Sequence, residues 1–266
     1  MMTRSQPPSS DWSNITPGLL YQDIMAASMI LTRIPVTYEF ETEPDTKRSY
    51  WAFPIIGVGV AAIPGAIGAL LVTAGIPPLA SAMLALGGIM ILTGGLHQDG
   101  LADVADGLGG RDPSHRLRIM RDSATGSFGT LALLIFTMTA AVYLADLGSN
   151  SPWGMLHALV ASAALSRAMM ALQRVMRSPP DETGLAHLTG QPDMIVAATS
   201  LLLGLLLAIV FTGISAAIAG FLAGVAVTLA LGWFLERWIG GVNGDGLGAT
   251  QQISETAILM TFVMIG

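Results

Sequence analysis

The segment AFPIIGVGVAAIPGAIGALLVTA, at Ala52–Ala74, contains no charged side chain. A helix of about 20 predominantly apolar residues can cross the roughly 30 Å hydrocarbon core of a bilayer. This segment therefore predicts a membrane span, and comparable apolar segments follow it along the chain. The sequence predicts seven spans, at Ala52–Ala74, Leu79–Leu96, Phe128–Ala145, Trp153–Gln173, Met194–Phe211, Ile214–Phe234 and Ser254–Ile265.

The composition supports the same architecture. Of 266 residues, 52% are hydrophobic and 11% are charged, and the mean hydropathy is +0.63; these values lie outside the usual range of soluble proteins. We expect an all-α fold, a polytopic integral membrane helix bundle. Leu19–Ile34 is apolar but contains Asp23 and Arg33, which favours an N-terminal interfacial or partly re-entrant helix over a span. An eighth span is the alternative. Residues 1–18 form a polar tail, and 19–266 a single membrane-embedded catalytic domain.

Charge and cysteine content exclude several classes of protein. A net charge of −6 argues against nucleic acid binding, because few basic residues are left to neutralise phosphates. The absence of cysteine excludes disulfides and thiolate zinc sites. All 12 Lys and Arg residues fall on one side of the predicted spans. Basic loops stay in the cytoplasm, so we expect a cell inner (cytoplasmic) membrane protein whose active site faces the cytoplasm.

The segment GLHQDGLADVADG, at Gly95–Gly107, places three carboxylates on one helical face. Asp99, Asp103 and Asp106 are spaced i, i+4 and i+7, which puts them within about 60° of one another. Like charges repel at this spacing and are costly at a membrane edge, and a hard cation such as Mg²⁺ would relieve both penalties. We predict that these three bind Mg²⁺ and act in catalysis with Asp122. The alternative is that the aspartates cap helix ends or form a solvated face.

Further polar residues on the same side of the membrane are candidates for binding a phosphorylated substrate. MRDSATGSFG, at Met120–Gly129, precedes a span, and backbone amides at a helix start bind phosphate; a simple N-cap at Ser123 or Ser127 is the alternative. The arginines suit phosphate binding, or only set topology and anchor helices. Asp245 lies in a glycine-rich turn that suits a nucleotide or second metal, or an Asx turn. The predicted substrate-binding residues are Arg33, Arg111, Arg118, Arg121, Ser123, Asn243, Asp245 and Glu255.

Taken together, these motifs resemble the cobalamin synthase family, adenosylcobinamide-GDP ribazoletransferase. The resemblance covers nearly the whole chain and is most specific where HQDGLADVADG is combined with MRDSATGSFG. Its other motifs are TRIPV at Thr32–Val36, FPIIGVGV at Phe53–Val60 and GDGLGATQQISE at Gly244–Glu255. The chain departs from the family pattern at Asn243, where a Thr is expected, and at Gln252, where an acid can occur.

The resemblance implies a Mg²⁺-dependent transferase of cobalamin biosynthesis. It implies that the ribose 5′-hydroxyl of α-ribazole, or of its 5′-phosphate, attacks the cobinamide-linked phosphorus of adenosylcobinamide-GDP; GMP leaves, and adenosylcobalamin or its 5′-phosphate forms. The implied partners are these small molecules and the lipid bilayer, and a homo-oligomer remains open. DGLAD partly matches the CDP-alcohol phosphotransferase pattern, but Asp103 stands where that pattern has Arg. A transporter is disfavoured because the carboxylates gather at helix ends rather than at mid-membrane.

Overall fold

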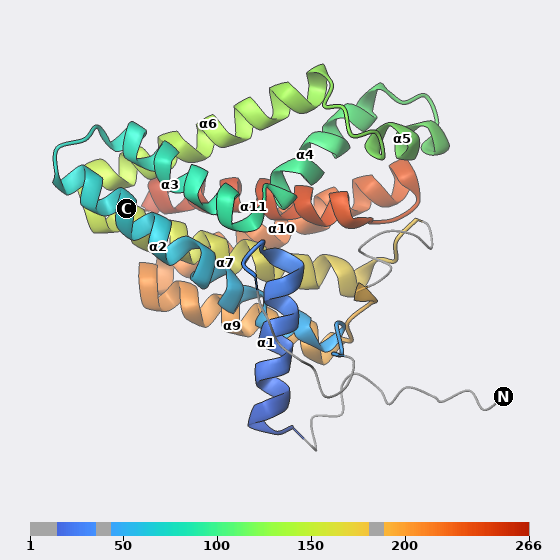
Figure 1. Ribbon diagram of the computed structural model, residues 1–266, viewed down its shortest axis with the longest axis horizontal. Helices are drawn as coiled ribbons and strands as arrows, with labels where there is room; N and C mark the ends of the chain where they lie inside the picture. Colours follow the sequence, from blue (N-terminus) through green and yellow to red (C-terminus); the bar gives the residue numbers. More distant parts are fainter. Residues whose placement is uncertain (1–14, 36–43, 181–188, 266) are drawn as a thin grey trace.

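The structure, a computed structural model, describes residues 15–35, 44–180 and 189–265. Every regular element in these three ranges is a helix, which confirms the predicted all-α fold (Figure 1). The elements are α1 (Pro17–Leu31), the short 3-10 helix η2 (Arg48–Ala52), α2 (Phe53–Thr73), α3 (Pro78–Thr93), α4 (Leu96–Asp106), η3 (Gly107–Gly109), α5 (Pro113–Met120), α6 (Ser127–Asn150), α7 (Pro152–Met176), α9 (Met194–Thr212), α10 (Ile214–Ile239) and α11 (Gly244–Ile265).

Five helices of the described ranges are long and apolar enough to cross a membrane. They are α2 together with η2, α6, α7, α9 and α10, and each coincides closely with a predicted span. A sixth crossing requires α3 and α4 to be counted together. The predicted number of seven is therefore not confirmed. The helix at the seventh position, α11, begins at Gly244 rather than Ser254 and has a polar first half, so it falls outside this group.

The predicted second span is wrong at its end, because the chain bends sharply there. Gly94 and Gly95 have φ values of 66° and 70°, a left-handed conformation that glycine adopts at little cost. α3 therefore stops at Thr93, and α4 begins at Leu96 at an angle of 93° to it. The acidic stripe lies on this separate helix of 11 residues. Such a helix is only about 16 Å long and cannot cross a bilayer by itself.

The central helix of the bundle is α7. Inside the protein, 83% of its most apolar stretch is buried, compared with 22% to 44% for the other four spans. Helix α2 packs closely on it, because Gly57 leaves no side chain between the two backbones: a Cβ there would collide with the carbonyl of Ala163. Met155, Leu165 and Met169 of α7 are fully buried. The remaining spans surround α7 and shield it from lipid.

Helix α1 runs across the direction of the long helices instead of alongside them (Figure 1). Its start is fixed by Thr16, whose hydroxyl accepts a hydrogen bond from the backbone N–H of Leu19. Its middle is held by Asp23, which is buried and accepts hydrogen bonds from Arg48 Nε at 2.8 Å and Trp51 Nε1 at 2.9 Å. Arg48, which the sequence allowed to be a simple anchor for the lipid surface, therefore joins α1 to η2. The interfacial position of α1 stays a prediction.

The two ends of the bundle differ in character. The short connections between α2 and α3, α6 and α7, and α9 and α10 lie at one end, and the segment α4–α5 with the start of α11 lies at the other (Figure 1). The predicted site residues other than Arg33 and Glu255 belong to this second end. Its assignment to the cytoplasm rests on the charge distribution and stays a prediction.

Candidate active site

The candidate site is built where α4 crosses the beginning of α11. Gly100 of α4 faces the backbone of Asp245, and a Cβ at Gly100 would lie 2.8 Å from the Asp245 carbonyl oxygen and 3.2 Å from the Cα of Gly248. The crossing is therefore possible only because neither helix has a side chain there. In this crossing, the acidic face of α4 lies beside the first turn of α11. We call Asp99, Asp103, Asp106 and Asp245 the acidic cluster.

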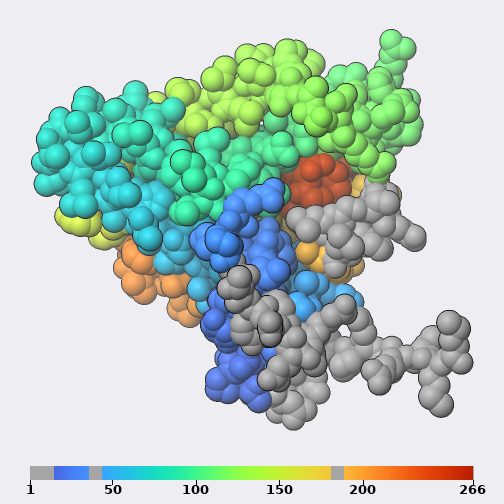
Figure 2. All heavy atoms as spheres, in the orientation of Figure 1, coloured from blue at the N-terminus to red at the C-terminus, as the bar shows by residue number. Residues whose placement is uncertain are grey.

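The start of α11 is organised by Asn243. Its Oδ1 accepts a hydrogen bond from the backbone N–H of Gly246 at 2.9 Å, as an N-cap residue does. Its Nδ2 donates to Asp245 Oδ2 at 2.9 Å, which orients that carboxylate. Asn243 thus positions Asp245. Asn243, Gly244 and Asp245 are partly exposed, whereas residues 246–251 are buried. Figure 2 shows red atoms of the C-terminal segment at the surface beside the green segment.

Asp103 is the electrostatic centre of the acidic cluster. It is half-buried, whereas Asp99 is exposed. The pKa of Asp103 is raised to about 7, chiefly by burial and then by the negative charge of Asp245, with Asp99 and Asp106 acting in the same direction. Asp103 lies on α4, outside the five spans. Because burial and the neighbouring negative charges disfavour its ionised form, this carboxylate favours binding a cation or a proton.

Asp106 shows the capping geometry that the sequence left open as an alternative. Its Oδ2 accepts a hydrogen bond from the N–H of Gly126 at 2.7 Å, and its Oδ1 accepts one from Gly129 at 2.8 Å. These amides begin α6, so Asp106 caps that helix from across the site. A Cβ at Gly126 or Gly129 would collide with the carboxylate. Asp106 therefore fixes α6 against α4, and its predicted role as a metal ligand stays a prediction.

The loop before α6 stands open beside the cluster. Arg121, Asp122 and Ser123 are all exposed. Asp122 Oδ1 accepts a hydrogen bond from the N–H of Ala124 at 3.1 Å, a local turn contact. Neither Ser123 nor Ser127 caps α6, because the N-cap position is Gly126. The phosphate-binding role predicted for this loop remains a prediction.

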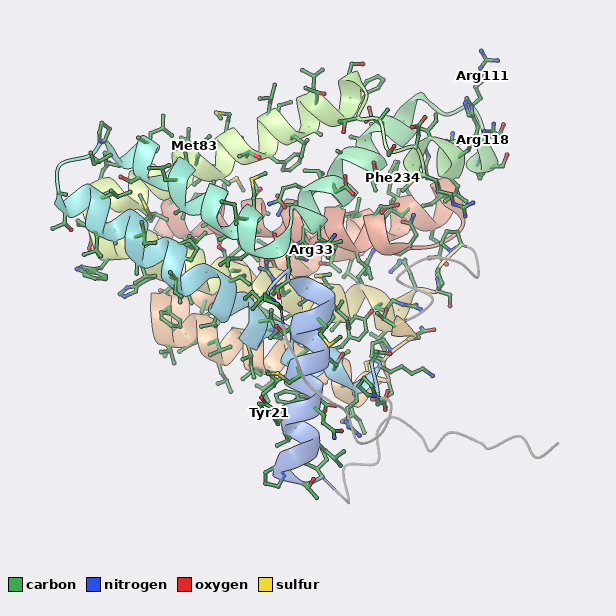
Figure 3. All side chains as sticks on the ribbon, in the orientation of Figure 1. Tyr21, Arg33, Met83, Arg111, Arg118 and Phe234 are labelled. Carbon is green, nitrogen blue, oxygen red and sulfur yellow. The ribbon has the colours of Figure 1, made fainter. Side chains whose placement is uncertain are left out.

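The arginines in and just before α5 separate into two groups. Arg111 and Arg118 are exposed and point away from the bundle (Figure 3), so the structure does not bring them into the acidic cluster. Arg116, one of the arginines that the sequence suggested for phosphate binding, donates to the carbonyl of Trp238 at 2.8 Å, and its guanidinium lies 5.2 Å from the Trp238 ring centroid. Arg116 therefore fastens α5 to the end of α10.

Helix α5 itself begins at an aspartate cap. Asp112 accepts hydrogen bonds from Ser114 Oγ at 2.6 Å and from the N–H of His115 at 2.9 Å. These bonds, the Ser114 hydroxyl first, lower the pKa of Asp112. Asp112 is thus a structural carboxylate and does not belong to the acidic cluster.

Glu255 lies away from the acidic cluster, inside the bundle. It is ten residues beyond Asp245 on α11, about 15 Å along the helix. Its carboxylate accepts a hydrogen bond from Gln251 Nε2 at 2.8 Å and lies 3.5 Å from Ser162 Oγ. It also interacts electrostatically with Arg167, which is 1% exposed. The structure thus assigns Glu255 an interior setting, and its predicted contact with substrate stays a prediction.

The sequence analysis missed this interior polar group. Arg167, Gln251 and His97 are all at most 1% exposed. Arg167 Nε and His97 Nε2 are buried without a hydrogen-bond partner among the described residues. The signal in the sequence was Arg167, because an arginine within an apolar span is costly and is usually paired or functional. The sequence analysis counted Arg167 only among the basic residues on one side of the spans.

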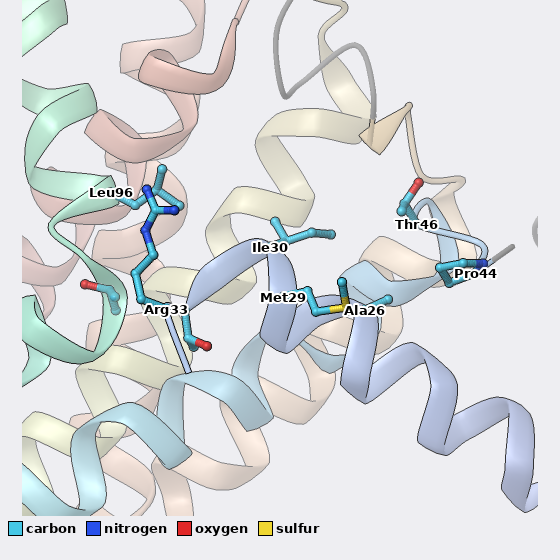
Figure 4. Close-up of a pocket in the computed structure, with 9 residues that line it drawn as sticks. Ala26, Met29, Ile30, Arg33, Pro44, Thr46 and Leu96 are labelled. Carbon is cyan, nitrogen blue, oxygen red and sulfur yellow. The ribbon is translucent and has the colours of Figure 1, made fainter. Parts of the chain in front are cut away.

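Arg33 lies beside the bend between α3 and α4. Its backbone N–H donates to the carbonyl of Leu92 at 2.8 Å, and its side chain covers Gly94, where a Cβ would lie 2.5 Å from Arg33 Cγ. Its guanidinium lies beside Leu96 at one wall of a cavity of about 310 Å³ (Figure 4). Arg33 therefore lines a pocket.

The acidic cluster can be tested against the expected Mg²⁺. Among the described residues, no three Asp, Glu or His side chains converge closely enough to hold a metal by themselves. Mg²⁺, however, commonly takes one or two carboxylates and completes its shell with water and substrate phosphates. Asp99 and Asp103 are one helical turn apart, and Asp245 acts on Asp103 from α11. These carboxylates therefore fit a magnesium ion that arrives with a phosphorylated substrate, or whose coordination shell that substrate completes.

Comparison with known proteins identifies the family. The model of the cobalamin-5-phosphate synthase family matches residues 23–263. This chain belongs to that family. Three similar members, each named adenosylcobinamide-GDP ribazoletransferase, come from Azorhizobium caulinodans, Allorhizobium ampelinum and Rhizobium johnstonii. They are 39%, 34% and 37% identical to this chain, over 90%, 92% and 89% of its length and 94%, 97% and 94% of their own. No solved structure matches.

The model of the cobalamin-5-phosphate synthase family matches residues in every helix that contributes to the candidate site. The matched range runs from α1 to the last turn of α11, so it includes both helices of the acidic cluster and the pocket beside Arg33. The family resemblance seen in the sequence motifs is therefore confirmed.

Proposed function

We propose that this protein is an adenosylcobinamide-GDP ribazoletransferase that works with Mg²⁺ at the cytoplasmic face of the inner membrane. It joins adenosylcobinamide-GDP to α-ribazole, or to α-ribazole 5′-phosphate, and releases GMP. The observation that carries the proposal is the crossing of α4 and α11, which gathers four carboxylates at the open end of a membrane bundle. The nearly full-length match to relatives of that name supports it.

The chemistry requires a particular balance of charges. A ribose oxygen of the acceptor bonds to the cobinamide-linked phosphorus, while the bond to the bridging oxygen breaks and that oxygen leaves on GMP. Because the 5′ oxygen of α-ribazole 5′-phosphate is already esterified, the hydroxyl that serves both acceptors is a different one. A diphosphate cannot approach bare carboxylates without a counterion. When bound, Mg²⁺ would neutralise the diphosphate and the departing phosphate.

The residues of this chain have distinct tasks in that scheme. Asp99, Asp103 and Asp245 would hold the cation, and Asn243 keeps Asp245 oriented through its 2.9 Å hydrogen bond. Asp106 keeps the start of α6 against α4. A carboxylate of the acidic cluster is positioned to take the proton of the attacking hydroxyl. The exposed Arg121 and Ser123 lie at the rim, where phosphate oxygens would pass.

The proposal is tested with membranes from cells that lack this activity and produce the chain. Incubated with adenosylcobinamide-GDP, α-ribazole and Mg²⁺, they should form the joined corrinoid and GMP in equal amounts. Membranes with equal quantities of Asp103→Asn should form neither above background. If wild-type membranes match membranes without the chain, the proposed function is wrong. The CDP-alcohol phosphotransferase and transporter alternatives are not favoured by the comparisons, and neither predicts formation of a joined corrinoid.

A further inference from the structure

The cavity beside Arg33 lies between α1 and the bend of α3 and α4, and the proposed chemistry leaves it unexplained. This elbow pocket, of about 310 Å³, is lined by Ala26, Met29, Ile30, Arg33, Thr93 and Leu96, among others (Figure 4). Helix α1 forms one wall, and the bond network of Asp23 with Arg48 and Trp51 holds that helix in place. This network fixes the wall that α1 contributes, and the volume of the pocket lies at the small end of ligand sites.

The lining of the elbow pocket favours an apolar ligand over a polar one. Three threonines contribute to its lining, but each hydroxyl proton is already donated to a backbone carbonyl: Thr32 to Ser28, Thr93 to Ile89 and Thr46 to Thr189. With no hydroxyl proton left to donate, the threonines offer no partner to the acceptor atoms of a base such as guanine, which would lose more hydrogen bonds to water there than a largely apolar ring would. Among the described residues of the lining, the charged group is the Arg33 guanidinium.

The elbow pocket also lies in line with the acidic cluster. Leu96, in its wall, is seven residues before Asp103 on α4, which places the two within about 20° on one face and about 10 Å apart along the axis. Asp99 lies between them, one turn beyond Leu96. A ligand seated in the pocket would extend along this face toward the carboxylates, and Arg33 would border its path.

We propose that the elbow pocket binds the base of the acceptor nucleoside, and that Arg33 binds the acceptor's 5′-phosphate when one is present. The inference rests on the proposed function, which requires an acceptor with a flat, bicyclic, dimethylated base. That base is apolar and small enough for the pocket, whereas the corrinoid is far too large. The ribose then points along α4 to the acidic cluster, and the elbow at Gly94 and Gly95 sets the angle between base and reacting hydroxyl.

The first test fills the pocket. Met29, 54% exposed at the pocket wall, is changed to Trp, and Met138→Trp, at a methionine 43% exposed on the outer face of α6, is the matched control. Overpacking should raise the KM for α-ribazole about ten-fold in Met29→Trp. The KM for adenosylcobinamide-GDP should be unchanged, and Met138→Trp should match wild type in both. If both KM values change, or neither does, the proposal is overturned.

The second test removes the charge. Arg33→Gln should raise the KM for α-ribazole 5′-phosphate about ten-fold more than the KM for α-ribazole, and Arg33→Lys should restore part of the difference. An equal effect on the two acceptors would contradict the role of Arg33. A phospholipid is the competing occupant. Lipid that copurifies with wild type and is lost in Met29→Trp, while the acceptor KM is unchanged, would overturn the proposal.

Direct binding separates this inference from the proposed function. Calorimetry with purified protein and α-ribazole, without adenosylcobinamide-GDP, should show binding by wild type and Met138→Trp and about ten-fold weaker binding by Met29→Trp. If wild type binds α-ribazole in this pattern but forms no joined corrinoid, the proposed reaction is wrong and the pocket assignment holds. If the joined corrinoid forms but Met29→Trp binds α-ribazole normally, only the pocket assignment is wrong.

Discussion

The contact between Gly100 and α11 allows a test of the site that changes no charged residue. In Gly100→Ala, the new Cβ would start 2.8 Å from the carbonyl oxygen of Asp245, and ordinary contact begins at 3.4 Å. The two helices must therefore separate by about 0.6 Å, because the obstacle is backbone and cannot rotate away. Since a displacement of about 1 Å in a catalytic arrangement can cost roughly a hundred-fold in rate, we expect kcat to fall between about ten-fold and a hundred-fold.

Stability should respond much less than activity. Overpacking costs about 1–3 kcal/mol, and alanine in a helix regains about 1 kcal/mol relative to glycine, so the net loss should not exceed about 2 kcal/mol. Gly87→Ala in α3 is the matched control, because a Cβ at Gly87 meets nothing within 4 Å. GMP release and the apparent Tm in detergent are measured for both variants. If Gly100→Ala is as active as Gly87→Ala, the α4–α11 crossing does not form the active site.

Four further outcomes are expected. Asp103→Asn should lose most GMP release at every Mg²⁺ concentration while still inserting into the membrane, because it keeps the shape of the carboxylate but removes the charge that a hard cation needs. Normal turnover of this variant with normal magnesium dependence would leave only the helix-capping interpretation. Because the pKa of Asp103 is raised to about 7, its carboxyl is protonated below that pH. The Mg²⁺ concentration for half-maximal activity should therefore fall as the pH rises through about 7. The same half-maximal Mg²⁺ concentration on both sides of that pH would contradict this prediction. Arg118→Lys should leave turnover within about two-fold, since the exposed Arg118 points away from the cluster; a large loss would restore its predicted role in phosphate binding. Reporter fusions at Gly110 should read cytoplasmic and those at Gly75 external, and the reverse pattern would invalidate the topology.

The sequence predicted the helices well where apolarity alone determines them. In the described part of the chain, each of the five helices that are long and apolar enough to span the membrane coincides closely with a predicted span, because an uninterrupted apolar segment has few other stable states in lipid. It predicted the course of the chain poorly at Gly94 and Gly95. Adjacent glycines are compatible with a continuous membrane helix as well as with a left-handed bend, and only the packing of α4 decides between them. The acidic stripe was therefore expected at the end of a span and lies instead on a short helix of its own.

The candidate site was predicted in its residues but not in its geometry. The spacing of Asp99 and Asp103 showed that they share a face, since that is a local property of a helix. That Asp245 joins them depends on the contact of Gly100 with Gly248, between segments far apart in the sequence. Glu255 was grouped with Asp245 because both were placed near the start of a span. Since α11 begins at Gly244, ten helical residues carry Glu255 into the bundle.

The central position of α7 has a consequence for how the protein is made. Its Arg167 is covered by the rest of the bundle and interacts with Glu255 of α11, yet α11 follows α7 along the chain and is therefore synthesised after it. An arginine at the centre of a helix costs about 2.5–3.5 kcal/mol on insertion scales, so α7 enters the bilayer carrying a charge whose partner does not yet exist. The newly made chain must therefore keep α7 away from lipid, at the insertion machinery or behind the helices already inserted, until α11 arrives. Full burial of the central helix therefore waits for the synthesis of α11.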